Sequence, residues 1–169
     1  MNAMSIRALT LAALPLGLLL SAGAAQAQTQ DLAMPVTSCT PNTGDSLSKV
    51  SMNPAAGFVR ANNPKAGTVV YTCNVLDSFV DITPIWTRFG MQYRDAVGGR
   101  VTATMYGKNK ITGASFVVAA VASPASAVIN NVAVPLPVLN YDLNSYYAVV
   151  RMVSDNVVPP EAHLIRVEQ

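Results

Sequence analysis

The residues that could carry out catalysis are few and far apart. His163 is the only histidine among 169 residues, and no serine lies in the Gly-x-Ser-x-Gly context that presents a nucleophile in many hydrolases. Nucleophilic catalysis needs a base beside the serine or cysteine. Because His163 follows a proline pair and lies near Glu161, we expect it in an exposed loop or at a strand edge. The sequence predicts no catalytic residue and no enzyme activity.

Paired carboxylates could hydrolyse glycosidic bonds, and clusters of them could bind calcium. The candidates lie in polar stretches rich in turn residues, where aspartate usually caps a turn or is solvated. They are Asp77, Asp81, Asp95, Asp142 and Asp155. Asp77 and Asp81 are four positions apart, whereas the acidic ligands of a calcium loop alternate. We expect neither a metal nor a cofactor.

One predicted strand offers a candidate ligand-binding face. In the stretch Ile85–Arg94, four polar or aromatic side chains fall on the same side of an extended chain. They are Trp86, Arg88, Gln92 and Arg94. Aromatic and arginine side chains on a rigid sheet suit sugar rings or a protein partner. The alternative is that Trp86 caps the core from a strand end while the arginines are solvated.

Two cysteines, Cys39 and Cys73, have thirty-three residues between them. In an exported protein a disulfide is the expected state. The alternatives are a metal-binding pair or a reactive thiol, but neither cysteine has a second ligand nearby in the sequence. We expect the disulfide to stabilise the fold by about 3–4 kcal/mol through the entropy of the unfolded chain.

The elements that must position these residues are strands. Val101, Ala103 and Met105 alternate with polar neighbours, which indicates a half-buried strand. A polar loop, Gly107–Gly113, separates it from Ser115–Val121, a more uniformly apolar strand that we expect to be covered on both faces. These two strands predict an antiparallel hairpin.

Other stretches continue the alternation, and Phe89, Met91 and Tyr93 form the inward side of one of them. Strands are predicted over 68–75, 85–94, 127–134, 146–153 and 162–168. We expect Gly98-Gly99 to form a hairpin tip and the prolines after 127–134 to place that strand at a sheet edge. About seven to nine strands predict an all-β antiparallel β-sandwich of Greek-key or jelly-roll type.

The first residues have the features of an export signal. Arg7 precedes an apolar stretch, Ala8–Leu20, and Ala25-Gln26-Ala27 is a small-x-small cleavage sequence. We predict a signal peptide over 1–27, a flexible leader over 28–38 and one domain over 39–169; the alternative is an uncleaved N-terminal anchor. The uncharged stretch Ile111–Tyr141 contains prolines and asparagines that are costly in lipid, so no membrane span is expected after cleavage.

Several of these pieces also resemble a known type of protein. They are Cys39, the YTC sequence that ends at Cys73, VTATMY over 101–106 and YYAVVRMV over 146–153. In this order they resemble small exported bacterial β-sandwich proteins with a signal peptide and one disulfide. The resemblance implies a sandwich and carries no activity.

The formal net charge is only +2 and the basic residues are dispersed, so nucleic acid is not an expected partner. The sequence favours an exported, non-catalytic structural or interaction protein, in the periplasm or outside the cell. The alternative is a carbohydrate- or ligand-binding β-sandwich module. Its partner would then be a glycan or another exported protein. The uncharged region could instead supply an edge strand for self-assembly.

Overall fold

The computed structural model describes residues 31–42, 48–62, 67–75, 85–154 and 158–169. These residues form eleven strands and one 3-10 turn, η1 (Val36–Ser38). The strands are β1 (Leu32–Pro35), β2 (Thr40–Pro41), β3 (Val50–Asn53), β4 (Phe58–Ala61), β5 (Gly67–Asn74), β6 (Arg88–Asp95), β7 (Val101–Asn109), β8 (Ser115–Ala122), β9 (Ser126–Pro135), β10 (Asn144–Ser154) and β11 (Glu161–Glu168). The strand number exceeds the expected seven to nine because strands as short as β1 and β2 are too brief to show alternation.

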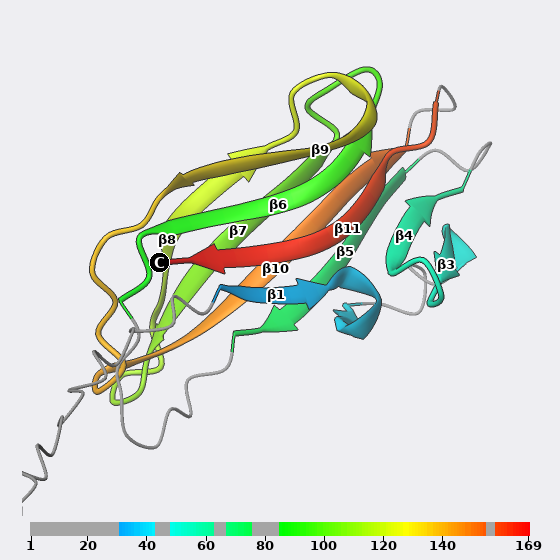
Figure 1. The fold of residues 1–169 in the computed structure, drawn as a ribbon. Helices are drawn as coiled ribbons and strands as arrows, with labels where there is room; N and C mark the ends of the chain where they lie inside the picture. Colours follow the sequence, from blue (N-terminus) through cyan, green and yellow to red (C-terminus); the bar gives the residue numbers. More distant parts are fainter. Residues whose placement is uncertain (1–30, 43–47, 63–66, 76–84, 155–157) are drawn as a thin grey trace, which may run out of the picture.

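The strands form two antiparallel sheets that face each other (Figure 1). The six-stranded sheet has the order β3-β4-β11-β6-β9, with β1 also paired to β11; the five-stranded sheet has the order β2-β5-β10-β7-β8. Within them, β4-β11-β6-β9 faces β5-β10-β7-β8, which is the jelly-roll order. The predicted all-β antiparallel sandwich is confirmed.

The core lies between the sheets and follows the predicted alternation. Phe89 and Met91 on β6 and Met105 on β7 are almost completely buried, as are Val150 on β10 and Ile165 on β11. Each such side chain contributes roughly 1.5–3 kcal/mol relative to exposure. This burial leaves the intervening side chains of β6 and β11 on the outer face of the six-stranded sheet, which is the face turned away from the other sheet.

The predicted hairpin at Gly98-Gly99 is wrong, because β6 and β7 belong to different sheets. The chain crosses between the sheets there, and both glycines adopt positive φ, +86° and +73°. Asp95 stabilises the crossing: its buried carboxylate accepts hydrogen bonds from the Arg100 backbone N–H at 2.9 Å and from Ser123 Oγ at 2.6 Å. Glycine pairs mark a turn but do not determine which sheet the next strand joins.

Of the expectations for β9 and β8, the first is confirmed and the second is wrong. β9 is an edge strand, as its following prolines predict. β8 was expected to be covered on both faces, but it is the opposite sheet's edge strand and the Val117 side chain is 60% exposed. An apolar run therefore does not distinguish a central strand from an uncovered edge.

The Cys39–Cys73 disulfide is present, as predicted. It lies where the chain passes from β1 in the six-stranded sheet to β2 in the five-stranded sheet, and joins this segment to β5. In the described part of the expected leader over 28–38, β1 pairs with β11 and Val36 is completely buried. The predicted signal peptide lies outside the described residues. Within the described ranges, no helix has the length and apolar character needed to cross a membrane.

Candidate functional site

The predicted ligand-binding face is partly assembled in the structure. Arg88, Gln92 and Arg94 lie on the outer face of β6, alternating with the buried Phe89, Met91 and Tyr93. Trp86 is not part of this face, because its side chain is only 4% exposed and belongs to the core. It precedes β6, so the strand alternation does not extend to it, and the large apolar ring turns inward. The alternative interpretation of Trp86, as a cap on the core, is therefore the one observed.

Strands β11 and β9 flank β6 and complete the surface. On the outer face, three β6 residues each have one neighbour from β11 and one from β9. The rows are Arg88 with Glu168 and Pro135, Gly90 with Arg166 and Ala133, and Gln92 with Leu164 and Asn131. Polar groups from three strands that are distant in sequence thus lie side by side on a rigid sheet.

A shallow hollow of about 220 Å³ opens between these rows. Its lining consists of Arg88, Asn131, Val132, Ala133, Arg166 and Glu168. Gly90 belongs to the middle row and contributes no side chain. A Cβ at this position would lie 2.6 Å from the Val132 carbonyl oxygen and 2.8 Å from the Ala133 Cβ, so β6 and β9 approach closely here. Ala133 is the apolar side chain of the hollow beside Gly90, and charged and amide groups make up most of the lining.

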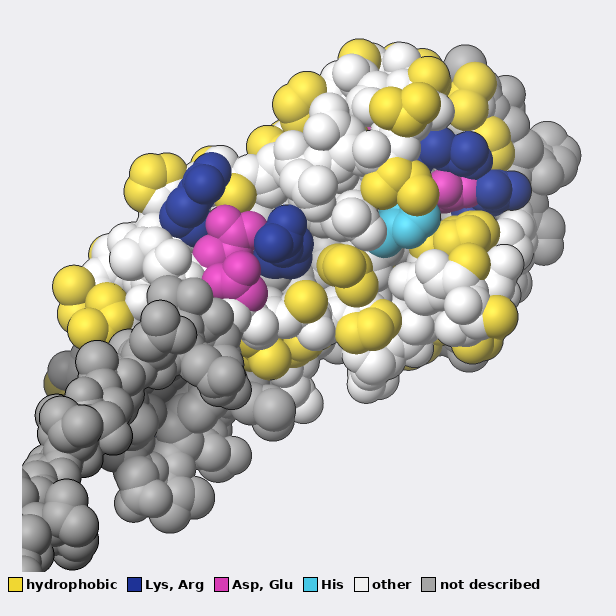
Figure 2. All heavy atoms as spheres, viewed as in Figure 1, with side chains coloured by type: hydrophobic (Ala, Val, Ile, Leu, Met, Phe, Trp, Pro, Cys, Tyr) yellow, Lys and Arg dark blue, Asp and Glu magenta, His cyan; other side chains and the backbone are white. Residues whose placement is uncertain are grey.

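Charged side chains gather at two places on this face (Figure 2). In the Glu168 cluster, which consists of Arg88, Arg166 and Glu168, the carboxylate lies between two arginines. Arg166 Nη2 is 3.2 Å from Glu168 Oε1, and Arg88 Nη1 is 3.9 Å from Oε2. Asp31 lies 3.9 Å from Arg166 on the other side. The Arg88 side chain is 56% exposed, so it is accessible from solvent.

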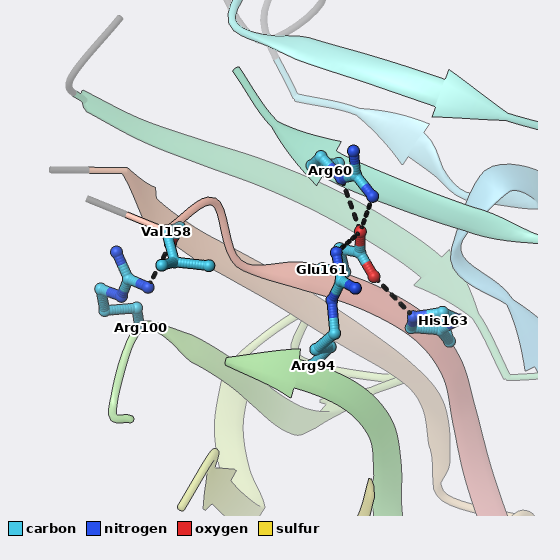
Figure 3. A network of polar contacts seen from close by, with 6 residues as sticks. All are labelled: Arg60, Arg94, Arg100, Val158, Glu161 and His163. Atoms are coloured by element: carbon cyan, nitrogen blue, oxygen red, sulfur yellow. Dashed lines mark hydrogen bonds and ion pairs between the residues drawn. The ribbon is translucent and has the colours of Figure 1, made fainter. Parts of the chain in front are cut away.

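The second group, the Glu161 cluster, consists of Arg60, Arg94, Glu161 and His163 (Figure 3). Arg94 Nη2 donates to Glu161 Oε1 at 2.6 Å, and Arg60 Nε and Nη2 donate to the same oxygen. His163 Nε2 lies 3.3 Å from the other oxygen, Oε2. The Glu161 side chain is only 3% exposed, and three side chains therefore surround a buried carboxylate.

A β-bulge places Glu161 on this face. The pairing of β11 with β6 shifts between Ala162 and Leu164, so His163 is an extra residue in β11. Because of this extra residue, Glu161 pairs with Arg94 and Arg60 and points outward as they do. The expectation that His163 is exposed is wrong: its ring packs 5.2 Å from the Phe58 ring and is almost completely buried.

The sequence pattern did not indicate Asn131, Arg166 and Glu168 as residues of the hollow, nor Arg60 and Glu161 as residues of the Glu161 cluster. The alternation over 162–168 already placed Arg166 and Glu168 on one side of a strand. The alternation did not reveal the strand order, which brings Arg166 and Glu168 beside Arg88. Nothing in the local pattern signalled the bulge at His163.

The side chains of this face present hydrogen-bonding groups on a fixed surface. Arginine, asparagine and glutamine present planar hydrogen-bonding groups on a surface whose backbone is fixed by the sheet. Among the described residues, no three His, Cys, Asp or Glu side chains lie close enough together to hold a metal. Of the candidate aspartates, Asp95 is buried in the crossing between sheets, Asp142 is exposed, and the other three lie outside the described residues.

Comparisons with known proteins concern the fold. No protein-family model and no curated protein sequence matches the chain. Among solved structures, it is similar to the C-terminal family 6 carbohydrate-binding module of LamC, a marine laminarinase from Zobellia galactanivorans. That match has a TM-score of 0.50 and 13% identity, and covers 83% of this chain and 100% of the module.

A second family 6 carbohydrate-binding module matches with a TM-score of 0.48 at 13% identity, covering 82% of this chain and 93% of that one. The family 32 module of C. perfringens NanJ, solved with galactose, matches with a TM-score of 0.42 at 11% identity, covering 83% and 100%. At 13% identity, the likeness of this chain to the LamC module is one of fold alone.

Proposed function

We propose that this protein is an exported, non-catalytic module that binds carbohydrate on the outer face of its six-stranded sheet. The observation that carries the proposal is the hollow beside Ala133, around which two arginines, an asparagine and a glutamate present hydrogen-bonding groups. Sugars carry many hydroxyl groups, and these donors and acceptors are complementary to them. The solved structures of similar fold include carbohydrate-binding modules, which is consistent with the proposal.

The polar groups around the hollow can act without rearrangement of the backbone. β6 is paired on both sides, to β9 and to β11, so the positions of Arg88 and Arg166 are fixed relative to Asn131. A preorganised site avoids much of the entropy that binding otherwise costs. Export is the part of the proposal that the Cys39–Cys73 disulfide supports, because such bonds persist in oxidising compartments.

A second candidate is a structural or interaction protein without a glycan ligand. The observation in its favour is the exposure of apolar side chains on the two edge strands, at Val117 on β8 and at Val128 and Ile129 on β9. Unpaired edges of this kind can accept a further strand. The binding experiment below distinguishes the two candidates.

The test is affinity electrophoresis through gels that contain single polysaccharides, followed by calorimetric titration with the corresponding oligosaccharides. We expect retardation in at least one polysaccharide and a loss of affinity of about tenfold in Asn131→Ala, since losing one hydrogen bond costs roughly 1–3 kcal/mol. Asn131 is exposed on an edge strand, so the change should leave stability within about 0.5 kcal/mol.

The matched control is Arg151→Ala, which removes an exposed arginine from β10 in the other sheet and should leave binding unchanged. If no polysaccharide retards the protein, the proposal fails and the interaction protein is favoured. Binding that Asn131→Ala leaves intact would show that the ligand lies elsewhere.

A further inference from the structure

The Glu161 cluster contains more positive charge than its one carboxylate balances. Arg60 and Arg94 both direct their donors at a single oxygen, Glu161 Oε1. Among the described residues, neither arginine forms an ion pair with any other acidic group. One buried negative charge is therefore shared by two guanidinium groups, and the cluster has a surplus of one positive charge when His163 is neutral.

The side chains of both arginines remain partly exposed. The side chains of Arg60 and Arg94 are 40% and 35% exposed, whereas the Glu161 side chain beneath them is 3% exposed. The two arginines come from strands on either side of β11 and converge on the carboxylate (Figure 3). An anion that approaches this face meets the two cations before it meets the buried carboxylate.

The arginines are also held in place before any ligand arrives. The Arg60 guanidinium lies 5.3 Å from the centre of the Phe58 ring, a cation–π contact. His163 contacts both the Phe58 ring and Glu161 Oε2. These contacts fix the carboxylate that orients the two arginines. Arginine offers a planar fork of donors that matches a carboxylate or a sulfate, and a pre-oriented fork loses less entropy on binding.

We propose that Arg60 and Arg94 form a subsite for an anionic group, a carboxylate or a sulfate, on an acidic polysaccharide bound along this face. The inference rests on the proposed carbohydrate-binding function and specifies the class of ligand. Arg88 at the hollow and Arg94 at the cluster are six residues apart on β6, which corresponds to about 20 Å along a strand. The ligand is thus an extended chain of several sugars, with Gln92 and Leu164 between the two sites.

The test compares three kinds of polymer on the intact protein: a polyuronate, a sulfated polysaccharide and a neutral glucan. We expect one of the acidic polymers to bind at least tenfold more tightly than the neutral glucan, with an affinity that falls as sodium chloride is raised. Which acidic polymer binds distinguishes a carboxylate from a sulfate. Arg60→Gln should remove most of the preference for the acidic polymer.

Two variants keep the experiment informative. Arg151→Gln removes an exposed positive charge from the opposite sheet and should leave the preference unchanged. If Arg60→Gln does not fold, Arg60→Lys keeps the positive charge but lacks the paired donors of the guanidinium. Its binding of the acidic polymer should still weaken with salt and should be weaker than that of the original protein. A thermal melt of each variant shows whether it is folded.

The outcomes separate this inference from the proposed function. Equal binding of neutral and acidic polymers, or equal loss of acidic binding in Arg60→Gln and Arg151→Gln, overturns the anionic subsite and leaves carbohydrate binding in place. Failure to bind any of the three polymers, together with no retardation in the wider panel, overturns the proposed function itself.

Discussion

Gly90 is a residue at which β6 and β9 approach closely, next to Ala133 and Arg166 of the hollow. A side chain here would collide with the Val132 carbonyl oxygen at 2.6 Å, and a backbone atom in a paired strand cannot move away cheaply. We predict that Gly90→Ala destabilises the protein by about 1–3 kcal/mol, the usual cost of overpacking. It should also weaken glycan binding by displacing β9. Urea denaturation measures the first effect and calorimetric titration the second.

Ala133→Gly provides the matched control for this substitution. It removes the second atom that a new methyl group would meet, the Ala133 Cβ at 2.8 Å. In the background of Gly90→Ala it should restore part of the lost stability, which a double-mutant cycle detects. A Gly90→Ala protein as stable as the original would show that β9 has room to move.

At the same scale, the sequence predicts side chains within a strand well and side chains at its irregularities poorly. Phe89 and Met91 inside, and Arg88 and Gln92 outside, follow from alternation alone. Trp86 and His163 depart from it, the first because it precedes the strand and the second because it forms a bulge. Both departures depend on contacts with residues that are distant in sequence.

Among the elements, the segment that links β1 to β2 is joined to the fold by the Cys39–Cys73 disulfide. This segment passes from one sheet to the other and contains only the η1 turn between two short strands. We predict that Cys39→Ser/Cys73→Ser lowers the free energy of unfolding by about 3–4 kcal/mol, from the entropy of a loop spanning 34 residues. Urea denaturation of the two proteins measures the difference.

Reductant provides the control for this prediction. Adding dithiothreitol should shift the unfolding of the original protein toward that of the double serine variant and leave the variant unchanged. Mass spectrometry of the unreduced protein should show the loss of two hydrogens. An unfolding midpoint that is the same in the variant and the original would contradict the prediction.

The sequence predicts most long elements, but not how they are distributed between sheets. The alternation over 101–106 and 146–153 is a local property, and β7 and β10 form where it predicts them. Their membership of one sheet with β5, and the separation of β6 from β7, depend on how the crossings pack. The candidate face combines β6, β9 and β11, so it could not be assembled from any one stretch.

For the whole molecule, a buried ion pair holds one end of the sandwich together. Asp95 follows the β6 outer-face residues, and its Oδ1 accepts from Arg100 Nε and Nη2 at 3.1 and 3.0 Å. Ser123, in the crossing from β8 to β9, donates to the same carboxylate. Arg100 also donates to the Val158 carbonyl before β11 (Figure 3). Three crossings between the sheets are therefore connected through one charged pair.

This connection predicts how the free energy of unfolding depends on pH. Burial raises the pKa of Asp95, but hydrogen bonds from Ser123, from the Arg100 and Gly98 backbone and from the Arg100 side chain outweigh it, so its pKa lies below the ordinary value. Below about pH 4, where an unfolded aspartate begins to bind protons, the unfolded state takes up more protons than the folded state. The contribution of Asp95 is fully present above that pH and is lost as the pH falls through its lowered pKa.

We predict that Asp95→Asn costs about 3 kcal/mol or more at pH 7, because Arg100 loses its buried counter-charge. The cost should shrink as the pH falls below about 4, because the unfolded aspartate then binds protons that the folded carboxylate resists, and the original protein loses stability. Urea denaturation at several pH values measures both proteins. Asp142→Asn, which changes an exposed aspartate, is the control and should leave the profile unchanged. A constant difference between Asp95→Asn and the original at all pH values would show that the charge of Asp95 is not what connects the crossings.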